Sequence, residues 1–123
     1  MYSILLIGFG GFLGTVMRYM TSSWFNKHFP HALLPYGTLL VNILGSFIIG
    51  LVFGLSEKYQ LIGTSWRLFW IVGFCGGFTT FSSFAYENVA MLQQSNYMGF
   101  ALYTAASVLC CLLAVFSGLW LCK

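Results

Sequence analysis

The stretch Gly76-Gly77-Phe78-Thr79-Thr80-Phe81-Ser82-Ser83-Phe84 lies in the middle of a long apolar segment of the chain. Its paired glycines and paired β-branched threonines are poor helix formers. Inside a membrane, backbone that leaves a helix finds no partner in lipid, so it survives only within protein or along a cavity. Helices interrupted in this way use freed carbonyls to hold cations and helix N-termini to attract anions. The stretch therefore predicts a functional interruption at Gly76–Thr80, against the alternative of a continuous helix with glycines used only for packing.

The chain as a whole is poor in charge. Of its 123 residues, 59% are hydrophobic and 6% are charged, whereas a soluble domain carries about 25% charged residues. A membrane-spanning helix needs about 20 mostly apolar residues. We therefore expect one all-α domain over residues 1–123, a multi-pass protein of the plasma membrane or the inner membrane, with its third helix broken in mid-membrane. The four expected spans are Tyr2–Phe25, Leu33–Leu55, Ser65–Gln93 and Tyr97–Leu121.

Several classes of function fit the sequence poorly. The net charge is +3, but the basic residues are scattered singly, so a nucleic-acid partner is not expected. No nucleophile–base pair, paired carboxylates or phosphate-binding loop is present, which argues against an enzyme. The cysteines form no C-x-x-C pair and lie in or beside apolar segments, where a thiol behaves as a small hydrophobe. They are Cys75, Cys110, Cys111 and Cys122.

The distribution of basic residues does not fix an orientation. An even number of spans places both termini on one side of the membrane, together with Lys58, Arg67 and Lys123. The other side carries Lys27, with Arg18 near the same end. The positive-inside rule needs a clear Lys/Arg excess, and the difference here is slight. The chain is therefore predicted to insert in both orientations, which permits an antiparallel homodimer.

Just beyond the predicted interruption, Phe81 and Phe84 share a helix face with Thr80, Glu87 and Asn88. Aromatic rings carry a positive edge, so edge-on phenylalanines can contact a small dehydrated anion. Most membrane phenylalanines only pack against neighbours. The polar residues on the same face favour the anion interpretation.

The second span carries Thr38, Asn42 and Ser46 at four-residue steps, which places them on one face. An amide in hydrocarbon is costly unless it is hydrogen-bonded. Asn42 therefore either bridges helices or donates an N–H to a permeating species, and spacing alone leaves both roles open.

Polar residues in the first, third and fourth spans also have two possible roles each. Tyr103, Ser107 and Cys111 step by four and form either a track of hydrogen-bond donors or contacts between helices. Arg18 either extends to the headgroups or concentrates anions in a vestibule. Glu87, the one carboxylate within a span, either faces water or pairs with a cation.

Three stretches together resemble the Fluc (CrcB) family of small membrane fluoride channels. They are GGFLGTVMRY in the first span, GTLLVNILGSF in the second and GFCGGFTTFSSF in the third. The resemblance covers nearly the whole chain and supplies the ion, which spacing did not. It implies an antiparallel dual-topology homodimer with two fluoride pathways and a central structural sodium ion. It also implies a passive, fluoride-selective channel that lets cytoplasmic fluoride leave the cell.

The resemblance also implies roles for individual residues. The backbone carbonyls of Gly76 and Thr79 would hold the sodium ion. Phe81 and Phe84 would present ring edges to fluoride, and Asn42 would donate an amide hydrogen bond beside them. The hydroxyls along the pathway would be those of Thr38, Ser83, Tyr103 and Ser107. Arg18 would be the vestibule arginine, and Glu87 the glutamate near one pore mouth.

One residue departs from the pattern of the family that the chain resembles, and one other family shares its number of helices. Cys111 stands where relatives can carry a hydroxyl, and a thiol is only a weak donor. The main alternative is a small dual-topology multidrug transporter of organic cations, which also has four helices. That family relies on a glutamate in the first span, where this chain has no carboxylate. A subunit that only packs against a partner is the remaining alternative.

Overall fold

The structure is a computed structural model that describes residues 2–30, 34–59 and 63–122, with no description of the Tyr59 side chain. All regular secondary structure in these residues is helical. The elements are α1 (Tyr2–His28), α2 (Tyr36–Tyr59), α3 (Thr64–Arg67), the π-helix η1 (Leu68–Cys75), α4 (Gly76–Phe78), α5 (Phe81–Gln93) and α6 (Tyr97–Leu121).

Within the described residues, four helical stretches are long and apolar enough to cross a membrane. This confirms the prediction of an all-α protein with four spans. The stretches are Tyr2–His28, Tyr36–Lys58, Thr64–Gln93 and Tyr97–Leu121.

The observed ends of the spans differ from the expected ends by a few residues. The first helix continues past Phe25 to His28, and Phe29 N–H still donates to the Phe25 carbonyl over 2.8 Å. Pro30 then disfavours helical backbone in the residue before it. The expected start of the second span at Leu33, and the Lys123 counted in the charge balance, lie outside the described residues.

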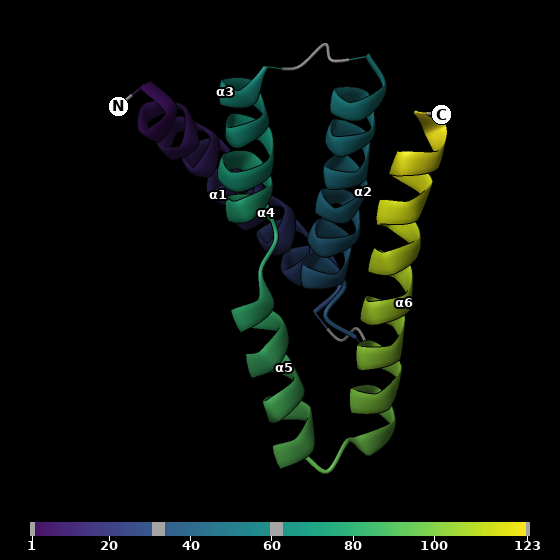
Figure 1. Cartoon of the computed structure of the whole chain (residues 1–123). Coiled ribbons are helices and arrows are strands. Elements are labelled where there is room, and N and C mark those ends of the chain that lie inside the picture. Colours follow the sequence, from purple (N-terminus) through teal and green to yellow (C-terminus); the bar gives the residue numbers. More distant parts are fainter. Residues whose placement is uncertain (1, 31–33, 60–62, 123) are drawn as a thin grey trace.

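The helices run alternately up and down, as Figure 1 shows. Helix α1 is inclined behind α3 and α4, α2 stands beside α6, and α5 and α6 form an antiparallel hairpin. Both chain ends lie at the upper end of the molecule in this view, here called the termini end. The opposite end, where residues 94–96 join α5 to α6, is called the hairpin end.

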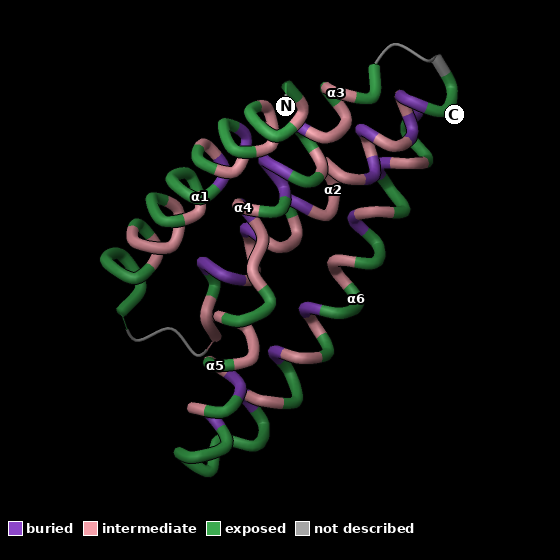
Figure 2. The backbone as a smooth tube through the Cα atoms, turned by 60° about the vertical axis from the view of Figure 1, so that its left-hand side comes forward, coloured by how far each residue is buried: buried purple, intermediate pink, exposed green. Residues whose placement is uncertain are grey.

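Glycines allow two pairs of helices to approach closely. A Cβ on Gly73 would lie 2.7 Å from the Ile7 carbonyl oxygen of α1. A Cβ on Gly118 would lie 2.6 Å from the Phe47 carbonyl oxygen of α2. Helix α1 is therefore packed against the first half of the third span, and α6 against α2. Figure 2 shows buried residues along these facing sides.

Helix α5 exposes large aromatic side chains beside the break. Its buried residues are Asn88 and Met91, whereas Phe81 is 77% exposed and Tyr86 is 75% exposed. The second half of the third span thus leaves one long face open, directly beside the interruption.

Candidate functional site at the broken third span

The interruption of the third span is two residues long. Thr79 (φ −88°, ψ 159°) and Thr80 (φ −153°, ψ 122°) are extended, whereas Gly76–Phe78 remain helical. The predicted interruption at Gly76–Thr80 is therefore confirmed but shorter than expected. Gly77 packs closely on α1, since a Cβ there would lie 2.6 Å from the Gly11 carbonyl oxygen, whereas a Cβ on Gly76 would meet only the Ile71 carbonyl oxygen, at 3.9 Å.

The break redirects the hydrogen bonds that a continuous helix would make. In such a helix each N–H donates to the carbonyl four residues earlier. Thr80 N–H instead donates to Asn42 Oδ1 over 2.8 Å, and Ser83 N–H donates to Thr80 Oγ1 over 3.2 Å. The carbonyl oxygens of Gly76 and Thr79 thereby lose their usual helical donors. These are the two carbonyls to which the family resemblance assigns a cation.

Arg18 replaces a third missing helical donor. In a continuous helix the Phe81 N–H would donate to the Gly77 carbonyl. Arg18 Nε donates to that carbonyl instead, over 2.8 Å, from a position 59 residues earlier in the sequence. The guanidinium caps the first half of the span, where the helix dipole is negative. Sequence reasoning missed this contact, and the vestibule role of Arg18 stays a prediction.

Asn42 joins α2 to the break through both ends of its amide. Its Nδ2 donates to the Thr80 carbonyl over 3.2 Å, and its Oδ1 accepts from the Thr80 N–H. The bridging role left open by the sequence is thus observed. An amide nitrogen carries two hydrogens, and the second N–H has no acceptor among the residues that the structure describes.

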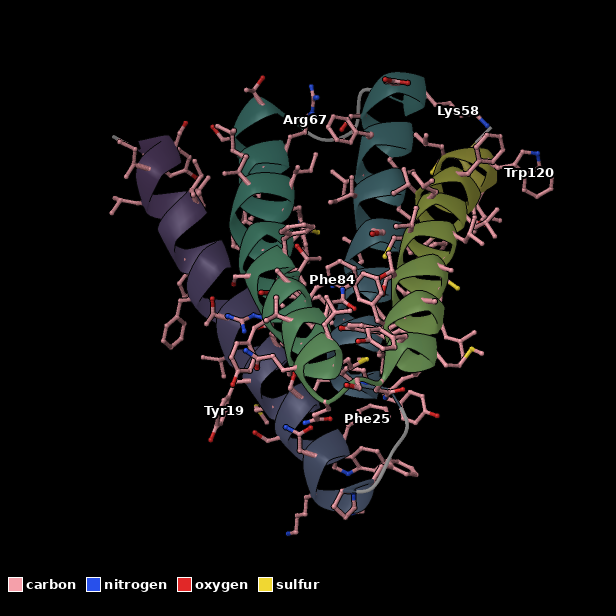
Figure 3. All side chains as sticks on the ribbon, turned by 90° about the horizontal axis from the view of Figure 1, so that it is seen from below. Tyr19, Phe25, Lys58, Arg67, Phe84 and Trp120 are labelled. Atoms are coloured by element: carbon pink, nitrogen blue, oxygen red, sulfur yellow. The ribbon has the colours of Figure 1, made fainter. Side chains whose placement is uncertain are left out.

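A cavity of about 300 Å³ lies against the break and is called the break cavity. The Phe81 and Phe84 rings line it, with centroids 5.6 Å apart, and Phe84 points into the space between α5, α2 and α6 (Figure 3). The polar and apolar residues around it come from these three helices and from the break itself. They are Asn42, Ser46, Ile49, Thr79, Thr80, Phe81, Phe84, Ser107, Val108 and Cys111.

A hydrogen-bonded group of three side chains lies next to the break cavity, towards the hairpin end. Thr38 Oγ1 donates to Glu87 Oε2 over 3.0 Å, and the Tyr103 hydroxyl donates to Glu87 Oε1 over 2.9 Å. Thr38 is 5% exposed and Tyr103 is completely buried. The Tyr103 ring also packs against Phe84, with centroids 5.1 Å apart. The carboxylate therefore connects α2, α5 and α6 at one point.

A second cavity, of about 370 Å³, opens on the far side of this group and is called the mouth cavity. Glu87 lines it, together with residues from the end of α1, the start of α2 and the α5–α6 turn. They include Phe25, Phe29, Tyr36, Tyr86 and Asn96. Along α2, α5 and α6 the order is thus mouth cavity, hydrogen-bonded group, break cavity.

The structure brings most of the predicted site residues together. Asn42, Phe81, Phe84 and Ser107 share the break cavity. Thr38, Tyr103 and Glu87 form the neighbouring group. Ser83 lines neither cavity, and its hydroxyl accepts from Thr80 Oγ1 over 3.3 Å.

Two residues at the break were not assigned a role from the sequence. Thr80 caps α5 with its hydroxyl, and a Cβ on Gly45 of α2 would collide with the Thr79 side chain. A threonine before a new helical run is an N-cap signal that could have been read. Nothing in the sequence indicates that Gly45 lies against Thr79.

The carbonyl oxygens at the break suit a hard cation. Carbonyl oxygens are the ligands that such ions prefer, and broken membrane helices offer them. Gly76 and Thr79 supply one carbonyl oxygen each that lacks its usual helical donor. These two carbonyl oxygens therefore fit a sodium ion as two of its ligands.

Comparison with known families and proteins places the whole chain among related sequences. The family described as CrcB-like protein, camphor resistance (CrcB), matches residues 5–119. The fluoride-specific ion channel FluC of Campylobacter lari is 50% identical over 122 residues, 98% of this chain and 98% of the relative. FluC of Leptospira interrogans is 43% identical over 121 residues, covering 98% and 94%. FluC 1 of Methanosarcina acetivorans is 45% identical over 118 residues, 96% of this chain and 88% of the relative.

Proposed function

The chain belongs to the CrcB family, and on that premise we propose that it is a fluoride-selective passive ion channel. It is a multi-pass membrane protein and not an enzyme. The observation that carries the proposal is the break cavity, where an amide and two aromatic rings surround the N-terminus of α5.

The chemistry of this cavity suits a small, strongly hydrated anion. Such an ion leaves water only where other donors replace its hydration shell. The free N–H of Asn42, the Ser107 hydroxyl and the positive ring edges of Phe81 and Phe84 are donors of this kind. The positive end of the α5 dipole adds to the attraction.

We further propose that the break holds a structural sodium ion through the carbonyl oxygens of Gly76 and Thr79. When bound, the cation would neutralise the partial negative charge of these carbonyls. The support is that their usual helical donors, the N–H groups of Thr80 and Ser83, are directed to other acceptors. Arg18 and Asn42 hold the carbonyls of Gly77 and Thr80, each of which directly follows one of the two residues in the sequence.

A second copy of the chain in the opposite orientation would supply the remaining ligands. The antiparallel homodimer is supported by the balanced basic charge of the two ends and by the open face of α5. Two copies related by a two-fold axis would bring the same two carbonyls to the axis from both sides.

The proposed direction of transport is out of the cell. Hydrofluoric acid crosses membranes as a neutral molecule and dissociates in the cytoplasm, which traps fluoride inside. A passive channel would then release the anion down its gradient, assisted by the negative-inside membrane potential.

The organic-cation transporter is the weaker candidate. Helix α1 carries no carboxylate, and both oxygens of Glu87 already accept hydrogen bonds from Thr38 and Tyr103. A carboxylate engaged in this way is a poor exchange site for bulky cations.

Efflux from liposomes tests the proposal directly. Purified protein in fluoride-loaded liposomes should release fluoride when sodium is present, and chloride-loaded liposomes should release nothing. Phe81→Ile should abolish the fluoride flux while the protein stays folded and dimeric, because the ring edge is lost. Phe12→Ile, on an exposed face of α1, is the matched control and should conduct normally. Absence of fluoride efflux from the wild type, or proton-coupled uptake of an organic cation, would overturn the proposal.

A further inference from the structure

Cys111 lines the break cavity, where the proposed function places the anion. It follows Ser107 by one helical turn on α6, so both face the same space. Ser107 is 6% exposed, and its hydroxyl finds no hydrogen-bond partner among the described residues. A buried hydroxyl without a partner, on a residue that lines a cavity, is suited to binding a ligand there.

The other three cysteines are placed differently. Cys110 precedes Cys111 on α6, and successive side chains point about 100° apart around a helix. Cys110 is partly exposed and does not line the break cavity. Cys75 is completely buried and Cys122 is 7% exposed, and their sulfurs donate to the Gly45 and Leu51 carbonyls over 3.6 Å. Cys111 is thus the one cysteine of the four that lines this cavity.

We propose that Cys111 is a modification site inside the pathway, open to small neutral thiol-directed electrophiles, and that its modification closes the channel. The proposal rests on the proposed function, since it takes the break cavity as the route of fluoride. The class of reagent is set by the cavity, whose walls beside Cys111 include Ile49 and Val108. A small uncharged reagent has no charge to desolvate against these walls, whereas the proposed route offers fluoride the donors of Asn42 and Ser107.

The modification can be written for an alkyl thiosulfonate. The Cys111 sulfur, after losing its proton to water, attacks the divalent sulfur of methyl methanethiosulfonate. A disulfide bond forms between Cys111 and the methylthio group. The sulfur–sulfur bond of the reagent breaks, and methanesulfinate leaves with its electron pair. No additional oxidant or reductant is needed.

The added group would obstruct the anion in two ways. A thiol is a weak donor, and the methylthio disulfide has no S–H at all. The extra methyl and sulfur also occupy space beside the Ser107 hydroxyl and the two phenylalanine rings, in a cavity of about 300 Å³. Fluoride would then lose one hydrogen-bond donor and part of the space in the break cavity.

The test combines flux with mass spectrometry in proteoliposomes treated with methyl methanethiosulfonate. Wild-type protein should gain a methylthio group on Cys111 and lose most of its fluoride efflux, and dithiothreitol should restore the flux. Cys111→Ser, compared with its own untreated sample, should keep its flux after treatment. Cys110→Ser is the matched control and should remain as sensitive as the wild type.

Three results would overturn the inference alone: flux that persists after complete labelling of Cys111, loss of flux in treated Cys111→Ser, or a Cys111 that stays unlabelled. Untreated wild-type protein that conducts no fluoride would instead overturn the proposed function, and the inference with it. The untreated sample therefore separates the two failures.

Discussion

Asn42 bridges α2 to the break and, in the proposed function, also donates an N–H to fluoride. One substitution should separate these two roles. Asn42→Asp keeps an acceptor for the Thr80 N–H, which lies 2.8 Å from Oδ1. Whether or not the aspartate is protonated, it lacks the second N–H that remains for an anion. We expect Asn42→Asp to fold and dimerise with little fluoride efflux, although an ionised aspartate loses the donor to the Thr80 carbonyl and therefore some stability.

Asn42→Ala removes the structural role of the side chain as well as its role toward fluoride. It leaves the N–H and carbonyl of Thr80 without the side-chain partner they have now. Each unsatisfied buried group costs about 1–3 kcal/mol, so this variant should unfold more easily in detergent and also fail to conduct. Fluoride efflux at the wild-type level from Asn42→Asp would show that the amide serves the fold alone.

Arg18 is expected to matter for stability because it caps a broken helix. Arg18→Ala removes the donor to the Gly77 carbonyl, a charge-assisted bond of 2.8 Å. Such bonds contribute about 1.5–3 kcal/mol, and thermal unfolding in detergent should shift accordingly. Arg67→Ala is the control, since it removes a cation–π contact with the Phe53 ring, 5.4 Å from the guanidinium, and no hydrogen bond of Nε to the described residues. Equal destabilisation by both substitutions would contradict the capping role.

At the scale of the elements, α2 sets the position of the break through Gly45. A Cβ at this position would collide with the Thr79 side chain, so Gly45→Ala must push Thr79 away from α2. Overpacking of this kind costs about 1–3 kcal/mol. We expect lower stability and a reduced fluoride flux, because the Thr79 carbonyl and the Asn42 bridge move together.

Gly8 of α1 provides the control for this substitution. A Cβ at Gly8 would have nothing within 4 Å, and alanine is a better helix former by about 1 kcal/mol. Gly8→Ala should therefore be neutral or stabilising and should conduct normally. A Gly45→Ala protein that matches Gly8→Ala in stability and flux would show that the break does not depend on close contact with α2.

The helical elements were predictable from the sequence, and the details of the break were not. Length and apolar composition placed the fourth span at Tyr97–Leu121, as observed. Paired glycines and threonines indicated where the third span would open. Which of these residues left the helix depended on Asn42 and Arg18, which lie 38 and 59 residues from their partners at the break. Contacts of that separation depend on how the helices pack, and no local pattern shows them.

At the scale of the whole molecule, the proposed dual topology can be tested by shifting the basic charge between the two ends. Lys27→Gln with Thr64→Lys would favour the termini end in the cytoplasm. Lys58→Gln with Gln93→Lys would favour the hairpin end there. Each double variant expressed alone should insert in one orientation, as tag accessibility reports, and should lose most of its fluoride flux. Expression of both together should restore the flux.

Chains that all have the same orientation should not conduct, because the proposed channel needs an inverted partner. Each chain offers the carbonyls of Gly76 and Thr79 and leaves a face of α5 open, with Phe81 77% exposed. If the partner must be inverted to complete the cation ligands and cover this face, copies that all point the same way cannot assemble a conducting pair. A double variant that conducts fully while every copy has the same orientation would require a parallel assembly or an active monomer. Wild-type protein found in a single orientation would remove the basis of the antiparallel pair before any flux is measured.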